Sequence, residues 1–119
     1  MKTLSSLLAL SILAPAVAFA APDPLAVAPD MYKLLFENDK VRVMAVDFQP
    51  GQKIAKHTHP NEHFLTVLKP GTITIFKEDG TSAINQLKTD QVVWVPAETH
   101  WAQNTGTSEV KLLVTEVKK

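Results

Sequence analysis

Residues 72–88 read "TITIFKEDGTSAINQLK", which is two alternating runs of residues separated by a short polar turn. Thr72 to Lys77 alternates β-branched residues with the two-residue period of a strand. The Asp79-Gly80 pair is typical of tight hairpin turns, because its backbone adopts the positive φ values that such turns need. Ser82 to Lys88 follows as the partner strand. This stretch therefore predicts a β-hairpin.

Similar strand signals continue on both sides of the hairpin. Apolar and β-branched runs bounded by proline or glycine turns occur at residues 41–48, 63–69, 91–96 and 110–118. No segment after residue 20 has the helical period and caps of an amphipathic helix. About eight short strands, with turns every 8–12 residues, predict an all-β sandwich or small barrel with no substantial helix.

The first 20 residues have the composition of a secretory signal peptide. Lys2 gives a short positive start, an uncharged and mostly apolar run follows, and Ala18-Phe19-Ala20 offers small residues at the positions that signal peptidase reads. The apolar run is too short to span a membrane and contains Pro15. We therefore expect cleavage after Ala20 and a periplasmic or secreted protein.

The rest of the chain divides into an arm and one domain. Residues 21–30, "APDPLAVAPD", carry three prolines and predict an extended N-terminal arm. Residues 31–119 are short enough for a single domain with one modest core. The apolar run Tyr32 to Phe36, beside the arm, is a candidate surface for a homodimer, because exposed edge strands of small β-sheet domains often pair.

Charge and cysteine content exclude several classes of function. The chain has 12 basic and 12 acidic residues, interspersed and without a basic stripe. Nucleic acid is therefore not expected as a partner, nor is a membrane once the signal peptide is removed. A small-molecule substrate or ligand is expected instead. The chain has no cysteine, which excludes disulfides, thiolate metal ligands and cysteine nucleophiles.

Three of the four histidines lie in residues 57–63, "HTHPNEH". His57 and His59 point the same way in extended backbone, because side chains alternate along a strand. A bend at Pro60-Asn61 can bring His63 to the same point, and a closed barrel could bring His100 there too. Such residues are also found in solvated loops. The mature chain has no other histidine, however, and this favours a site for one transition metal ion.

The spacing around these histidines resembles the two motifs of the cupin superfamily. Gly51, five residues, His57-x-His59 and Gly71 match the first motif, although His63 stands where the family has Glu and the last gap is one residue longer. In the second motif, Asp90 and Glu98 replace the two glycines around Pro96. The same motif is completed by His100 and Asn104, with one residue fewer before the histidine.

The resemblance implies a double-stranded β-helix, also called a jelly-roll barrel, with a metal ion held by inward side chains. It implies His57, His59 and His100 as ligands. The fourth ligand is His63, giving a four-histidine site, or Glu62. We favour His63, because Leu65 and Val67 would then face the interior with it.

The resemblance also implies the class of chemistry. We expect a metal-dependent oxidoreductase, of dioxygenase or decarboxylase type, that acts on a small oxygenated molecule, with Glu98 or Glu62 as candidate catalytic bases. The alternative is a non-enzymatic cupin that binds a metal or a small ligand. Metal uptake after export favours Cu or Zn by the Irving–Williams order, while Mn, Fe and Ni remain options.

Overall fold

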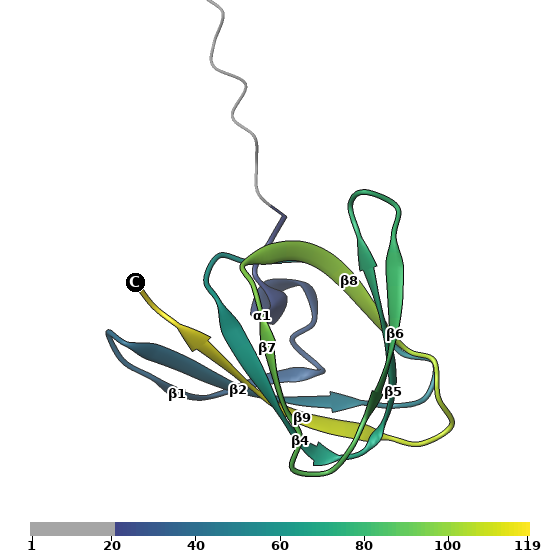
Figure 1. Ribbon diagram of the computed structural model, residues 1–119. Helices are drawn as coiled ribbons and strands as arrows, with labels where there is room; N and C mark the ends of the chain where they lie inside the picture. Colours follow the sequence, from purple (N-terminus) through teal and green to yellow (C-terminus); the bar gives the residue numbers. More distant parts are fainter. Residues whose placement is uncertain (1–20) are drawn as a thin grey trace, which may run out of the picture.

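The computed structural model describes residues 21–119, which form one short helix and nine strands in two antiparallel sheets (Figure 1). The five-stranded sheet has the order β1 (Tyr32–Glu37), β2 (Val41–Phe48), β9 (Val110–Val117), β4 (His63–Lys69), β7 (Val92–Val95). The four-stranded sheet has the order β3 (Lys53–His59), β8 (Glu98–Asn104), β5 (Gly71–Lys77), β6 (Ser82–Leu87). The predicted all-β jelly-roll architecture is confirmed.

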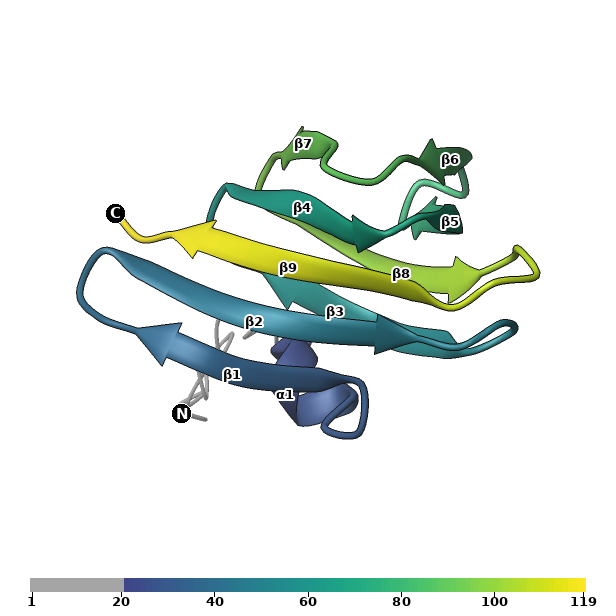
Figure 2. The same cartoon turned by 90° about the horizontal axis from the view of Figure 1, so that it is seen from below.

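Alternation along each strand decides which side chains fill the space between the sheets. In β9, Val110, Leu112 and Val114 are buried, while the residues between them are only half-buried. They meet the inward residues of β2, since Val46 pairs with Leu112 in the antiparallel register. The sheets curve around a common interior, so the core and any cavity lie inside the barrel (Figures 1 and 2).

The predicted hairpin is present. β5 pairs with β6 in continuous register from Gly71 opposite Leu87 to Phe76 opposite Ser82. Gly80 has a φ of 86°, and the turn is closed by a hydrogen bond of 2.9 Å from Lys77 N to Thr81 O. β2 and β4 also have the bounds that the sequence predicts.

The sequence pattern did not predict β8 as a strand. Its inward positions are His100, Ala102 and Asn104, which are buried but do not form an apolar alternation. Asn104 instead ties two turns together, since its amide nitrogen donates to the carbonyl oxygens of Phe48 and Ser108, both at 2.9 Å. Because the interior face of β8 is largely polar, the strand has no alternation of apolar and polar residues by which it could be predicted.

The proline-rich segment is not fully extended. Pro24–Val27 forms one helical turn, α1, capped by Asp23, whose Oδ1 accepts a 2.9 Å hydrogen bond from Leu25 N. Proline at the first helical position has the φ that a helix needs and lacks the N–H that would go unpaired there. Pro24 and Ala28 are buried, so the segment packs onto the barrel. Within residues 21–119, no helix is long and apolar enough to cross a membrane. The predicted signal peptide, residues 1–20, lies outside the described residues.

Two turn residues of the cupin pattern have positive φ, and one of them, Asp90, departs from that pattern. Gly51 has a φ of 81°, a conformation that glycine adopts without strain. Asp90 has a φ of 67° at a position where the family motif has glycine. Aspartate is among the few other residues that tolerate this region. The backbone conformation at this position is therefore one that glycine and aspartate can both supply.

Substitution of Gly71 tests how closely the two sheets pack. A Cβ at this position would overlap Cγ2 of Val110, which is fully buried at the start of β9. We expect Gly71→Ala to lower the free energy of unfolding by about 1–3 kcal/mol, as overpacked cores do. Urea denaturation measures it. The same change should have a smaller effect in a Val110→Ala background, where the overlapping methyl is gone. Equal losses in the two backgrounds would contradict this explanation.

Candidate metal centre

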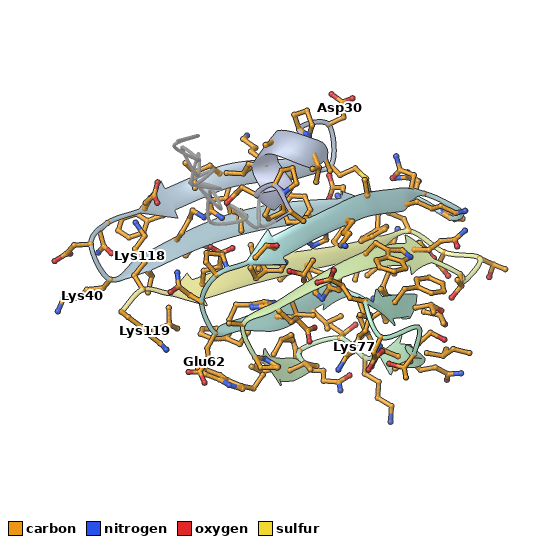
Figure 3. All side chains as sticks on the ribbon, turned by 90° about the horizontal axis from the view of Figure 1, so that it is seen from above. Asp30, Lys40, Glu62, Lys77, Lys118 and Lys119 are labelled. Atoms are coloured by element: carbon orange, nitrogen blue, oxygen red, sulfur yellow. The ribbon has the colours of Figure 1, made fainter. Side chains whose placement is uncertain are left out.

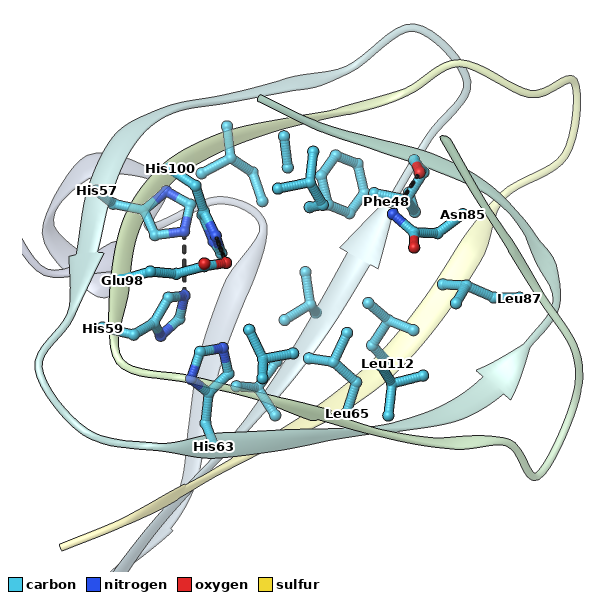
Figure 4. A pocket seen from close by; sticks show the side chains of 18 of the residues that line it. Phe48, His57, His59, His63, Leu65, Asn85, Leu87, Glu98, His100 and Leu112 are labelled. Carbon is cyan, nitrogen blue, oxygen red and sulfur yellow. Dashed lines mark hydrogen bonds and ion pairs between the residues drawn. The ribbon is translucent and has the colours of Figure 1, made fainter. Parts of the chain in front are cut away.

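Four histidines from three strands meet inside the barrel (Figure 4). β3 and β8 are hydrogen-bonded neighbours with His57 opposite His100, and His59 follows His57 on the same face. His63 begins β4, in the other sheet, and its ring lies next to that of His59 (Figure 4). All four side chains are buried, the most exposed being His100 at 6%.

The imidazole nitrogens lie close to one another. His57 Nε2 is 3.1 Å from His59 Nε2, and the ligand atoms of His57, His59 and His100 all lie within 4.8 Å of one another. The His63 ring stacks on His59, with 4.0 Å between ring centroids and 23° between planes. Three of the predicted ligands thus form a compact group that could hold a metal ion, and the fourth lies against it.

Each histidine has its Nδ1 bound to a protein acceptor. His57 Nδ1 donates to Ala55 O at 2.8 Å, and His63 Nδ1 donates to Asn61 O at 3.2 Å. The other two acceptors are carboxylates. His59 Nδ1 is 3.0 Å from Glu116 Oε1, and His100 Nδ1 is 2.8 Å from Glu98 Oε1. Because a neutral imidazole carries one N–H, these bonds place the hydrogen on Nδ1 and leave the lone pair on Nε2.

The donor set fits a bound cation. Two Nε2 lone pairs 3.1 Å apart, as in His57 and His59, need a proton or a metal ion between or beside them. Nitrogens bound at about 2.1 Å to one ion, at right angles, lie about 3.0 Å apart. Neutral imidazoles held by second hydrogen bonds are the usual protein ligands of Zn, Cu, Fe and Ni.

Burial keeps several of these imidazoles neutral. It lowers the pKa of His57 to about 4, and the nearby rings of His100 and His59 add to the effect. Burial and the neighbouring His59 likewise lower the pKa of His63 to about 4. Burial also lowers the pKa of His100, although its hydrogen bond to Glu98 acts in the opposite direction. At neutral pH these three rings therefore offer lone pairs rather than positive charge.

Glu62 and His63 differ in where they point. His63 is 1% exposed and faces the cavity, and Leu65 and Val67 follow on the same face. Glu62 is exposed, and Figure 3 shows it at the outer surface. Only its carbonyl group is held, by a 2.9 Å hydrogen bond from Val117 N. In the structure, His63 therefore lies at the cavity and Glu62 lies outside it.

Glu98 does lie at the cavity. Its Oε1 accepts from His100, and its Oε2 is 3.7 Å from Lys77 Nζ. The cavity has a volume of about 230 Å³, with the histidines on one wall. The remaining walls are mainly apolar and include Phe48, Leu65, Leu87, Leu112 and Val114, with the amide of Asn85 far from the histidines. The arrangement can hold a small molecule with one polar end.

Sequence reasoning missed Arg42 and Glu116. Both stand on the interior face of their strands and pair in register, Arg42 on β2 opposite Glu116 on β9. Glu116 accepts two 3.0 Å hydrogen bonds from Arg42 besides the one from His59. Burial alone would raise the pKa of Glu116, but these hydrogen bonds lower it to about 2. The available signal was a charge of each sign on the apolar face of two predicted strands.

Comparisons with known proteins agree with this architecture. A family model described as "Cupin domain" matches residues 44–116. A cupin domain from Bordetella pertussis Tohama I superimposes with a TM-score of 0.69 at 21% identity, over 75% of this chain and 93% of that chain. An RmlC-like cupin family protein with a double-stranded β-helix fold from Methanocaldococcus jannaschii gives a TM-score of 0.62 at 19% identity, over 73% and 78%. No match is found among the curated proteins. At these identities the structural likeness shows the fold alone.

Alanine substitution of each candidate for the fourth ligand distinguishes His63 from Glu62. We expect His63→Ala to weaken zinc binding by more than the roughly 10- to 100-fold loss that removal of an outer-shell partner causes. Glu62→Ala is the matched control and should leave the affinity unchanged. Competition with a chromogenic chelator measures both. Unchanged affinity in the His63 variant would indicate a three-histidine site, and a loss in the Glu62 variant would contradict its placement outside the cavity.

Proposed function

Because this chain belongs to the cupin domain family, we propose that it binds one divalent transition metal ion inside its barrel, through His57, His59, His63 and His100. The observation that carries the proposal is that all four rings use Nδ1 for a hydrogen bond to the protein. Every Nδ1 has a protein acceptor, so each Nε2 is directed away from that acceptor, and the Nε2 atoms of His57 and His59 lie 3.1 Å apart.

We further propose that the protein is an oxidoreductase of dioxygenase type that acts on a small oxygenated molecule. When bound, the metal would supply Lewis-acid chemistry at the histidine wall and, in the case of Cu, Fe, Mn or Ni, redox chemistry, whereas Zn²⁺ has none. A dioxygenase places both atoms of O₂ in its product, so the electrons balance without a separate reductant. The apolar walls, among them Leu65 and Leu112, would hold the body of the substrate and keep water out.

The size and lining of the cavity define the substrate class. Its volume of about 230 Å³ is below the range of roughly 300–1,000 Å³ that suits drug-sized ligands. A fitting molecule is small, with an oxygen donor at the histidine end and an apolar body. Glu98 lies beside His100 and can take or return a proton at that end.

A protein that binds a metal or small ligand without turnover is the second candidate. The narrow cavity also favours this function, because it leaves little room for both a substrate and O₂. Oxygen uptake by metal-loaded protein, tested with diketones, flavonols, thiols and oxalate, separates the two. Uptake that depends on both metal and substrate supports the enzyme. No uptake from fully loaded protein supports the binder.

The metal we propose is Cu or Zn, with Mn, Fe or Ni as the other options. Imidazole ligands suit Zn, Cu, Fe and Ni, and metal uptake outside the cytoplasm would follow the Irving–Williams order. Elemental analysis of protein purified from the periplasm identifies the metal. Stoichiometric Mn or Fe in that material would overturn the preference for Cu or Zn.

Glu98→Gln tests a proton-transfer role against an orienting role. The amide oxygen can still accept the hydrogen bond from His100, but it cannot take up a proton at neutral pH. We expect metal affinity to be retained and turnover to fall by about 100- to 10,000-fold, the usual contribution of a general base. Glu98→Ala should reduce both. Full turnover in the glutamine variant would exclude Glu98 as a base.

Export is a separate proposal. We propose that residues 1–20 direct the chain to the periplasm or out of the cell and are removed there. Mass spectrometry of protein from a periplasmic extract should give a chain that begins at Ala21. Protein found only in the cytoplasm with an intact N-terminus would contradict it.

A further inference from the structure

The segment before the first strand contacts the strand that carries two of the histidines. Pro22 O accepts a 3.0 Å hydrogen bond from Thr58 N, and Thr58 lies between His57 and His59 on β3. α1 packs next to β3, and Pro24 in α1 is fully buried. The segment therefore lies against the backbone that sets the direction of both rings.

A second connection runs through charged side chains to His59 itself. Asp23 Oδ2 is 2.5 Å from Arg42 Nη2, and Arg42 donates from Nε and Nη2 to both oxygens of Glu116. Glu116 Oε1 is 3.0 Å from His59 Nδ1. Side-chain exposure falls from 37% at Asp23 to 13% at Arg42, 3% at Glu116 and 2% at His59. The network thus leads from the surface into the histidine cluster.

The alternation of charges along this network has a physical explanation. A carboxylate as buried as Glu116 needs a hydrogen-bonded counter-charge, which Arg42 provides. Asp23 holds Arg42 from the other side and fixes the direction of its guanidinium. An ionised Glu116, held in place, keeps the hydrogen on Nδ1 of His59 and strengthens Nε2 as a donor to a cation.

We propose that Pro22–Ala28 is a positioning element of the metal site, which holds β3 through Pro22 and the His59 ring through Asp23, Arg42 and Glu116. This inference rests on the proposed metal binding. It makes metal affinity depend on residues that precede the barrel and that touch neither metal nor substrate. The residues concerned are positioning residues, because they act through His59.

Asp23→Asn separates this role from the capping of α1. Asparagine caps helices about as well as aspartate, so the hydrogen bond from Leu25 N survives, while the charge that faces Arg42 is lost. Asp30→Asn is the matched control, since it removes the same charge from an exposed site a few residues along the chain. Arg42→Gln breaks the link to Glu116, and Arg42→Lys restores the charge without the two-pronged contact.

Metal affinity is the first measurement, with Zn²⁺ and Co²⁺ as probes. We expect Arg42→Gln to weaken binding by about 10- to 100-fold, as loss of an outer-shell partner does. The Asp23→Asn variant should show a several-fold loss, Arg42→Lys should fall between Arg42→Gln and the unchanged protein, and Asp30→Asn should match the latter. The Co²⁺ absorption spectrum should shift in the Arg42 variants, which a change in global stability alone would not produce.

Imidazole ¹⁵N NMR of the metal-free protein is the second measurement. The His59 ring signals should change in Asp23→Asn and Arg42→Gln, while those of His63, held by the backbone carbonyl of Asn61, should not. Failure of the unchanged protein to bind metal would overturn the proposed function, and the NMR result would still decide whether the segment positions His59. Variants that leave both the affinities and the His59 signals unchanged would overturn this inference.

Discussion

The hydrogen bond at each Nδ1 is the constraint on which the candidate site depends. A buried imidazole can direct either of its nitrogens toward the cavity. In each of the four histidines, the hydrogen bond at Nδ1 determines which nitrogen this is. Two choices are made by the backbone, at Ala55 and Asn61, and two by carboxylates, at Glu116 and Glu98. The backbone acceptors belong to the same local segment as their histidine, while Glu116 lies on a distant strand. The site therefore requires the closed barrel and not only the "HTHPNEH" segment.

The two carboxylates have different surroundings. Glu116 is 3% exposed and bound by Arg42 from two nitrogens, so it has no freedom to move a proton. Glu98 is more exposed, at 16%, and its only cationic neighbour within the described residues is the more distant Lys77. Of the two carboxylates, Glu116 therefore only orients the His59 ring, whereas Glu98 also lines the cavity. For this reason the proposed proton transfer is assigned to Glu98.

The sequence predicted the parts that depend on local alternation. β2, β4 and the β5–β6 hairpin were found because their inward residues are apolar and their turns contain glycine or proline. β8 was missed because its interior residues are histidine, alanine and asparagine. The choice of His63 over Glu62 followed from two-residue alternation, which is also local. Arg42 and Glu116 were missed because their meaning appears only when β2 and β9 are paired in register.

The N-terminal segment shows why composition alone was misleading there. Three prolines in ten residues are typical of a linker, and most linkers make few contacts. Here one proline starts a helical turn, another offers its carbonyl group to β3, and Asp23 both caps the turn and binds Arg42. If cleavage follows Ala20, the mature chain starts just before Pro22 and Asp23. Cleavage a few residues later would remove both contacts, so the proposed signal peptide and the proposed metal site constrain each other's sequence.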